Sequence, residues 1–311
     1  MLFTAGSSKL KILLTGASGL VGSALAPLLA REGHQVIKLR RRPHPAESVE
    51  PLWDPDAGRI ELTSAGPLDA VIHLAGENIA QRWTAAAKTR IHNSRVEATN
   101  LLTQALVRAP QLPKIFISAS ATGYYGNRAE ELLDEQSAPG TGFLTEVCRG
   151  WETATKAATG HGVRVVNLRL GIVLSPKGGA LGKMLPPFRF GLGGRLGNGH
   201  QYWSWIAMDD LLSVIRHVLV NDALSGPVNA VSPNPVTNEE FTRTLGAVLG
   251  RPTFLTVPHL AVKLAFGEMA EETMLASCRV RPARLEKTGF AFQFPKLEGA
   301  LRHHLSTQQP G

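Results

Sequence analysis

Three glycines near the start of the chain have the spacing of a phosphate-binding turn. They lie in the stretch Gly16-Ala17-Ser18-Gly19-Leu20-Val21-Gly22, between an apolar run that ends at residue 15 and a helical pattern over 20–31. In this context the first glycine permits a tight turn, the second lets a pyrophosphate approach the backbone, and the third lets helix and sheet pack closely. The N–H groups that begin the helix attract phosphate. We therefore expect a dinucleotide to contact Gly16, Ser18, Gly19, Leu20, Val21 and Gly22. The alternative is a glycine-rich turn that binds nothing.

Arginines follow the second expected strand, 35–39, at the position that usually distinguishes two dinucleotides. An NAD-binding chain commonly carries Asp or Glu there for the ribose hydroxyls, whereas this chain continues as Leu39-Arg40-Arg41-Arg42. A guanidinium group binds a 2′-phosphate through paired, charge-assisted hydrogen bonds, and a carboxylate would repel that phosphate. The sequence therefore predicts NADP(H) as the cofactor, with Arg40 and Arg41 as contacts. A solvated basic loop is the alternative interpretation.

The elements that would position these residues alternate between strand and helix. Short apolar runs indicate buried strands, and periodic apolar positions between them indicate helices that pack on a sheet. This alternation predicts an α/β fold, a Rossmann-type doubly wound parallel sheet with a smaller, mostly helical C-terminal lobe. Between the second and third strands, 43–67 is expected to be irregular, with a short hairpin. The expected strands are 9–15, 35–39, 70–75, 114–118 and 163–170, and the expected helices are 20–31, 84–108 and 142–159.

The pattern changes after residue 174. Residues 175–199 are rich in Gly and Pro, which predicts a long loop of the kind that lines or covers a binding site. Asp209 or Asp210 is expected to cap a helix that ends near 220, and short helices and turns follow from 235. We assign 9–174, with returning segments at roughly 200–232, to an NADP-binding Rossmann domain. The rest, 175–311, is a substrate and C-terminal lobe that includes a small domain at 258–305.

Composition narrows the class of protein. With 43% hydrophobic and 19% charged residues, the 311-residue chain resembles soluble globular proteins. Its formal charge of +8 comes from scattered residues, and no nucleic-acid-binding signature accompanies it. No apolar run is long enough to cross a membrane, no signal peptide is evident, and Cys148 and Cys278 form no disulfide or metal-binding pattern. We therefore expect a cytoplasmic protein that binds a small-molecule substrate and has no metal, nucleic acid or membrane partner. The sequence leaves open whether the chain forms a homo-oligomer.

Further motifs resemble an atypical, extended branch of the short-chain dehydrogenase/reductase superfamily. This branch is the sugar-nucleotide epimerase family, also described as cell-division-inhibitor-like. The likeness covers nearly the whole chain, and the C-terminal part is similar to the family's small domain of unknown function. The motifs include Trp53-Asp54-Pro55, Leu74-Ala75-Gly76-Glu77-Asn78-Ile79, Arg82-Trp83-Thr84, Ser94-Arg95, Ser118-Ala119-Ser120-Ala121-Thr122-Gly123-Tyr124-Tyr125-Gly126, Trp151-Glu152, Gly178-Gly179-Ala180-Leu181 and Phe266-Gly267-Glu268-Met269-Ala270.

The resemblance implies NADP(H) binding, in agreement with the two arginines. It also implies that residues beyond the glycine loop line the cofactor at the carboxyl edge of the sheet, where open α/β sheets bind ligands. Small residues after the third strand would leave room for the adenosine ribose and the phosphates. The additional cofactor residues are Leu74, Ala75, Gly76, Arg90, Arg95 and Ser118.

The usual catalytic pair of the superfamily is missing from the sequence. A Tyr and a Lys four residues apart share one helix face, and the Lys lowers the pKa of the phenol so that it can shuttle a proton. Here Leu144 and Cys148, or Phe143 and Val147, stand at that spacing on the expected helix, and neither pair can do this chemistry. Ser120 matches the superfamily's substrate-orienting serine, and a packing role is the alternative for the tyrosines that follow it. The catalytic candidates are therefore Ser120, Tyr124 and Tyr125.

Two functions remain compatible with these features. One is an NADP(H)-dependent oxidoreductase or epimerase whose expected substrate is a nucleotide-linked sugar. The aromatic residues at 202–205 would then either stack on a base or pack as a strand. The other is a catalytically degenerate NADP(H)-binding regulatory or sensor protein, which would explain the missing Tyr and Lys. The sequence leaves open whether the protein turns over a substrate.

Overall fold

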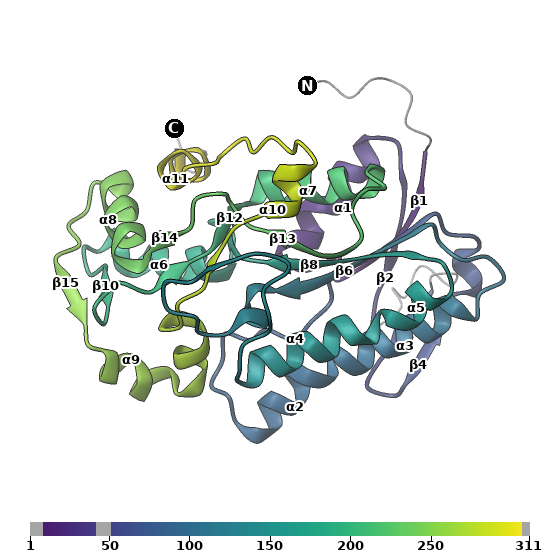
Figure 1. Ribbon diagram of the computed structural model, residues 1–311, viewed down its shortest axis with the longest axis horizontal. Coiled ribbons are helices and arrows are strands. Elements are labelled where there is room, and N and C mark those ends of the chain that lie inside the picture. Colours follow the sequence, from purple (N-terminus) through teal and green to yellow (C-terminus); the bar gives the residue numbers. More distant parts are fainter. Residues whose placement is uncertain (1–8, 42–50, 307–311) are drawn as a thin grey trace.

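A parallel six-stranded sheet forms the centre of the protein. The structure is a computed structural model and describes residues 9–41 and 51–306. The strand order is β13-β8-β6-β5-β1-β2, and every neighbouring pair is parallel. The expected Rossmann-type sheet is thereby confirmed (Figure 1). The strands are β1 (Lys11–Thr15), β2 (Gln35–Leu39), β5 (Ala70–His73), β6 (Ile115–Ala121), β8 (Arg164–Leu170) and β13 (Gly226–Ala230).

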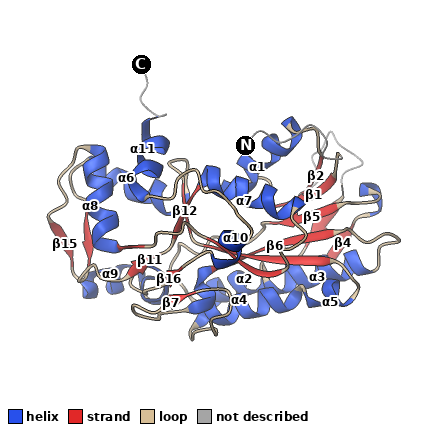
Figure 2. Cartoon of the chain, turned by 45° about the horizontal axis from the view of Figure 1, so that its top comes forward, coloured by secondary structure: helices blue, strands red, loops and turns tan. Residues whose placement is uncertain are grey.

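Helices cover both faces of this sheet, which explains why its inner strands are buried along most of their length. On one face lie α1 (Leu20–Arg31) and α7 (Met208–Val220), and on the other α3 (Val96–Val107), α4 (Phe143–Ala154) and α5 (Lys156–Gly160) (Figures 1 and 2). Successive residues of β1 alternate between the two cores. Ile12 and Leu14 pack in the core under α1 and α7, whereas Leu13 packs in the core under α3.

The order of the strands creates a binding crevice at the ends of β1 and β5. The chain first runs from β1 outward to β2 and later crosses to β5 on the other side of β1. Adjacent loops therefore diverge at the carboxyl ends of β1 and β5, and this topological switch point is where open α/β sheets bind ligands. Beyond β2, a bridge between Arg40 and Leu52 continues the sheet into a hairpin. The hairpin pairs β3 (Leu52–Asp54) with β4 (Arg59–Glu61), as expected for 43–67, of which 43–50 lie outside the described residues.

The prediction of one long helix over 84–108 is wrong, because the chain forms two helices there, α2 (Ala85–Asn93) and then α3. Ser94 Oγ accepts the Glu77 N–H at 2.9 Å and donates to the Ile91 carbonyl at 3.1 Å. The Arg95 guanidinium also donates to the carbonyls of Ile91 and Glu77. Tertiary hydrogen bonds to the loop after β5 therefore replace the helical continuation. The helix expected at 142–159 is likewise divided, into α4 and α5, at Thr155.

Residues 175–199 were expected to form a long loop, and this prediction is wrong in part. They contain α6 (Gly179–Arg189), which includes Pro186 and Pro187. Leu181, Leu185 and Phe188 have helical spacing and are buried in the core of the C-terminal lobe. Burial of this apolar face outweighs the turn-forming tendency of the glycines and prolines. The short strand β10 (Gly194–Leu196) follows.

The C-terminal lobe, the part of the molecule built around α6, is mostly helical with short strand pairs, as expected. Its core includes Trp203 and Trp205, so these aromatic residues pack as strand residues rather than stack on a ligand. The short strands are β7 (Leu132–Leu133), β9 (Ile172–Leu174), β11 (Tyr202–Trp203), β12 (Trp205–Ala207), β14 (Val236–Thr237), β15 (Leu255–Val257) and β16 (Arg279–Val280). The helices are α8 (Asn238–Leu249), α9 (His259–Phe266), α10 (Ala283–Lys287) and α11 (Leu297–Ser306), with a π-helical turn at Ala270–Met274.

Asp209 or Asp210 was expected to cap α7, but neither residue does so. The helix begins at Met208, so both acids lie in its first turn. The Asp210 carboxylate instead accepts the backbone N–H groups of Gln293 and Phe294, at 2.7 and 2.9 Å. Among the described residues, no helix is both long and apolar enough to span a lipid bilayer.

Candidate functional site

The glycine loop at the end of β1 has the geometry of a phosphate cradle. Gly16 has φ +68°, and a Cβ there would lie 2.7 Å from the Leu74 carbonyl carbon and oxygen. A Cβ on Gly22 would lie 2.2 Å from the Gly16 carbonyl oxygen. Gly19 and Ser18 are exposed, and no side chain among the described residues caps α1 at Gly19. The first N–H groups of α1 therefore remain available to a ligand.

The two arginines lie beside this cradle. In the sheet register, Leu39 at the end of β2 is opposite Thr15 at the end of β1. Arg40 and Arg41 follow directly, so they leave the sheet at the same edge as the glycine loop. Arg41 is exposed, and Arg40 forms the bridge to Leu52. The location suits a phosphate on the ribose of a bound dinucleotide, as expected from the sequence.

The end of β5 forms the other wall of the crevice. The N–H groups of Leu74 and Ala75 donate to Thr15 Oγ1 at 3.2 and 3.3 Å, which ties this loop to β1. His73 is fully buried between Thr15 and Thr99, with hydrogen bonds of 2.7 and 2.9 Å. Burial lowers the pKa of His73 to about 3, so the ring is neutral. His73 is thus a structural residue of the core.

Three residues expected at the cofactor have different surroundings. Arg95 donates to the Glu77 carbonyl at 2.9 Å and lies over the Trp151 ring, so it braces the loop after Gly76. Arg90 is exposed and donates to Gln81 Oε1 at 3.2 Å. Ser118 is fully buried opposite His73 in the sheet. This burial argues against the expected direct contact of Ser118, because a side chain with no exposed surface cannot reach a ligand.

A buried polar network lies at the carboxyl ends of β6 and β8. Ser120 Oγ donates to Glu152 Oε1 at 2.8 Å. The same carboxylate forms two hydrogen bonds of 2.8 Å with Nε and a terminal nitrogen of Arg169, a buried bidentate ion pair. Burial of Arg169 opposes its charge, but the hydrogen bonds and charge of Glu152 raise its pKa overall. The sequence singled out Ser120 without its partners, although Trp151-Glu152 stood among the family motifs.

The two tyrosines near this network differ in access. Tyr125 is fully buried, donates to Asn229 Oδ1 at 2.7 Å and accepts from Arg169 at 2.9 Å. Burial raises the pKa of Tyr125, which argues against its expected role as a proton donor and acceptor. Tyr124 is half-buried, and its ring lies 3.4 Å from the centre of the Arg169 guanidinium. Of the pair, Tyr124 is therefore the phenol that a substrate can reach.

Apolar residues surround the helix position where the superfamily carries its tyrosine. A Cβ on Gly123 would lie 3.3 Å from the Leu144 Cβ, so Leu144 faces the segment after β6. Leu144 belongs to a cluster with Trp83, Phe143 and Met269. Cys148 is buried, and burial raises the pKa of its thiol to about 11, which makes it a poor nucleophile.

The start of α6 also reaches the cofactor crevice, which the sequence did not reveal. A Cβ on Gly179 would lie 3.0 Å from Leu20 Cδ2, at the first turn of α1. Two helix N-termini, those of α1 and α6, therefore adjoin at Leu20. The Gly178-Gly179 pair had been noted only as part of a family motif.

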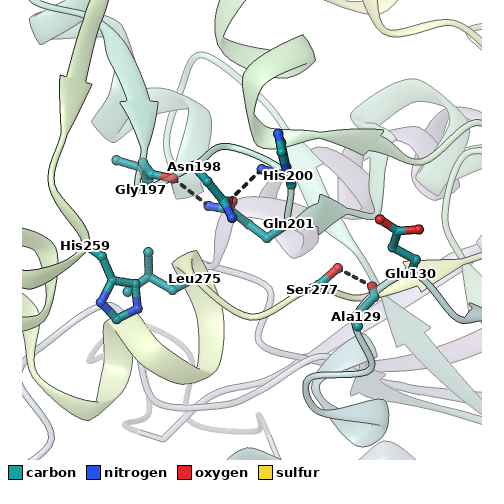
Figure 3. Close-up of a pocket in the computed structure, with 10 residues that line it drawn as sticks. Ala129, Glu130, Gly197, Asn198, His200, Gln201, His259, Leu275 and Ser277 are labelled. Carbon is teal, nitrogen blue, oxygen red and sulfur yellow. Dashed lines mark hydrogen bonds between the residues drawn. The ribbon is translucent and has the colours of Figure 1, made fainter.

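A cavity of about 470 Å³ opens between the segment after β6 and the C-terminal lobe. Glu130 and Ser277 line one side, His259 the opposite side, and Asn198 and His200 the wall between them (Figure 3). Ser277 Oγ donates to the Ala129 carbonyl, so this wall continues into the segment that carries the tyrosines. The cavity offers hydrogen-bonding groups and two imidazoles to a polar small molecule.

Two family models match the chain. The model described as the NAD dependent epimerase/dehydratase family matches residues 12–230, about the whole central sheet. The chain belongs to this family. A second model, described as a domain of unknown function (DUF1731), matches residues 257–304. The family resemblance noted in the sequence, including its small C-terminal domain, is thereby confirmed.

Relatives from bacteria and animals match this chain along nearly its whole length. The epimerase family protein Mb2239 of Mycobacterium bovis is 44% identical over 301 residues, which are 96% of this chain and 98% of the relative. The human epimerase family protein SDR39U1 is 38% identical over 299 residues, 94% of this chain and 99% of the relative.

Solved structures of epimerases are also similar to this chain in fold and sequence. The crystal structure of human SDR39U1 (isoform 2) with NADPH has a TM-score of 0.86 and 36% identity, covering 95% of this chain and 99% of that chain. A nucleoside-diphosphate sugar epimerase from Corynebacterium glutamicum has a TM-score of 0.78 and 38% identity, covering 97% of this chain and 59% of that chain.

Proposed function

We propose that this protein is an NADP(H)-dependent oxidoreductase or epimerase whose substrate is a nucleotide-linked sugar. The observation that carries the proposal is the pairing of an open glycine cradle at β1 with Arg40 and Arg41 at the end of β2. The cradle suits a pyrophosphate because the tight glycine turn leaves the first N–H groups of α1 uncapped by any described side chain, and the arginines suit a 2′-phosphate. The human relative solved with NADPH supports the same cofactor.

Cofactor preference tests this proposal directly. For Arg41→Ala we expect the Kd for NADPH to rise roughly 10- to 100-fold, because a hydrogen bond to a charged group is lost. The Kd for NADH should stay within about twofold, since NADH has no 2′-phosphate. Arg31→Ala, at the opposite end of α1, serves as the control and should change neither constant. Equal weakening of both cofactors in Arg41→Ala would refute the assignment.

NADP(H), when bound, supplies a hydride donor or acceptor, and the residues of this chain would orient the substrate and move the proton. Ser120 is held by Glu152, and Glu152 is held by Arg169, so the Ser120 hydroxyl has a defined direction. Tyr124 is the accessible phenol beside Arg169 and is our candidate for proton transfer. We infer that the cavity beside Glu130 and His200 accommodates the remainder of the substrate.

Turnover can be tested with a panel of nucleotide sugars and purified protein. We expect a change in nicotinamide absorbance, or sugar isomerisation with retained cofactor, for at least one member of the panel. Tyr124→Phe should reduce kcat while leaving the Kd for NADPH unchanged, because it removes only the phenolic hydroxyl group. If Tyr124→Phe keeps full kcat, Tyr124 is not the proton-transfer group. The Corynebacterium relative named as a nucleoside-diphosphate sugar epimerase makes this panel the first choice.

A regulatory, non-catalytic NADP(H)-binding protein is the second candidate, and one observation favours it. The two helix positions that could match the usual tyrosine carry Phe143 and Leu144, which pack in an apolar cluster with Trp83 and Met269. Such a site lacks an activated proton donor on α4. This candidate predicts tight NADPH binding with no turnover of any nucleotide sugar, so the same panel distinguishes the two functions.

A further inference from the structure

Three potential metal ligands meet where the C-terminal helix α11 contacts the first turn of α7. His303 and His304 are neighbours on α11, and Asp209 lies at the start of α7. His303 Nε2 is 3.3 Å and His304 Nε2 3.7 Å from the same oxygen, Oδ2 of Asp209. Each of the three residues offers one ligand atom, an imidazole nitrogen or a carboxylate oxygen, and these ligand atoms all lie within 4.8 Å of one another. Two imidazoles and one carboxylate form a ligand set typical of zinc sites that retain a water ligand.

The spacing is close to what a single ion requires. Ligand bonds of about 2.1 Å in a tetrahedral arrangement place neighbouring ligand atoms about 3.4 Å apart. The two distances from Asp209 bracket that value, and a small side-chain rotation would bring the imidazole nitrogens closer together. Asp209 and His303 are 44% and 40% exposed, so an ion can enter, whereas His304 is 9% exposed.

Residues around the three ligands hold them in place. The His303 ring stacks on Phe294, with centroids 4.5 Å apart and planes 27° from parallel. The backbone N–H of Phe294 is in turn held by the Asp210 carboxylate, one residue after Asp209. The first turn of α7 therefore supplies one ligand directly and positions another through Phe294. Such outer contacts, which fix ligand rings, accompany most protein metal sites.

We propose that Asp209, His303 and His304 bind a zinc ion, which joins α11 to α7. This inference is independent of the proposed reaction, because α7 lies on the sheet face opposite α3 and α4 and none of the three residues lines the cavity described above. Magnesium and calcium are disfavoured, because they select oxygen ligands and two of the three ligands here are imidazole nitrogens.

Titration of the full-length, untagged protein with zinc tests the site after removal of bound metal with a chelator. We expect one zinc ion per chain with a micromolar or tighter Kd, and no binding of magnesium. Asp209→Asn and His303→Gln should each weaken zinc at least about tenfold, because each removes one of three ligands. His161→Gln, an exposed histidine at the end of α5, is the matched control and should bind zinc as the parent does.

Two further measurements distinguish a built site from adventitious binding. Zinc should raise the Tm of the parent by a few degrees but not that of His303→Gln. It should also slow hydrogen exchange of α11 amides, since the ion ties this helix to α7. The proposal is overturned if zinc binds only with a millimolar Kd, or if Asp209→Asn and His303→Gln bind it as tightly as the parent.

Discussion

In the glycine loop at 16–22, the addition of a single carbon atom would cause a steric clash. Gly22 is needed because even one methyl group there would overlap the Gly16 carbonyl oxygen. Gly16 is needed twice, for its positive φ and for the close approach of Leu74. The arginines act differently, because they add charge at the edge of a site whose shape the glycines define. Binding of the dinucleotide and discrimination of its 2′-phosphate are therefore separable.

The buried histidine gives a pH-dependent prediction. The pKa of His73 falls from 6.5 when unfolded to about 3 in the fold, so the unfolded chain binds one more proton between these values. Its contribution to stability is complete above about pH 6.5 and is lost as pH falls, by about 1.4 kcal/mol per unit. We expect the free energy of unfolding to fall less between pH 7 and pH 5 in His73→Asn than in the parent, as measured with urea.

His161→Gln provides the comparison, because this histidine is exposed. It should show the same pH slope as the parent. Identical slopes for His73→Asn and the parent would mean that His73 does not remain neutral in the fold.

Among the helices, α4 shows how the small C-terminal domain supports the candidate active site. Its first N–H groups, from Phe143 and Leu144, donate to the two oxygens of Glu272 at 2.9 and 2.8 Å. A residue distant in sequence thus caps the helix that carries Glu152, the partner of Ser120. The favourable placement of a carboxylate at a helix N-terminus adds to this stabilisation.

Removal of the cap should be measurable. Glu272→Ala should lower the free energy of unfolding by about 1–2 kcal/mol, because two N–H groups lose their acceptor. The neighbouring Glu271→Ala, which removes only a surface ion pair with Lys263, should cost less than about 1 kcal/mol. Chemical denaturation compares the two variants. A cost for Glu271→Ala equal to that of Glu272→Ala would contradict the capping role.

Across the whole molecule, residues 279–306 connect the sheet with the C-terminal lobe. Strand β16 pairs with β7, and Arg284 donates to the carbonyls of Ser225 and Pro227 beside β13. Glu135 Oε1 accepts backbone N–H groups from both Asn229 and Arg284. Helix α11 then completes the core of the lobe. The chain is expected to unfold as one unit for this reason.

Leu301 tests that expectation. It is fully buried on α11 in the core shared with α6 and α8. Leu301→Ala should lower the free energy of unfolding by about 2–5 kcal/mol, because it leaves a cavity in a packed core. The adjacent Arg302→Ala, on the exposed face, should change it by less than about 1 kcal/mol. Calorimetry should show a single transition in both variants, and a separate early transition in Leu301→Ala would show that the lobe unfolds independently.

The local sequence was sufficient to predict an element wherever the interactions that form this element depend on neighbouring residues. The periodicity of 20–31 and the apolar run of 35–39 predicted α1 and β2 to the residue, because burial against a sheet follows directly from such patterns. The glycine spacing predicted the tight turn between β1 and α1, since Gly16 and Gly22 each answer a steric need of the backbone. The fold class followed from the same patterns, whereas the family followed from the longer motifs that resemble it.

Only the tertiary structure decided which polar side chains meet. Ser120 and Arg169 come together through Glu152 because β6 and β8 are neighbours in the sheet, and no spacing along the chain encodes that approach. The break before α3 and the helix α6 arose likewise, because distant hydrogen bonds and apolar burial overrode local propensity. Tyr124 and Tyr125 are adjacent in sequence, yet packing buries one phenol and leaves the other accessible.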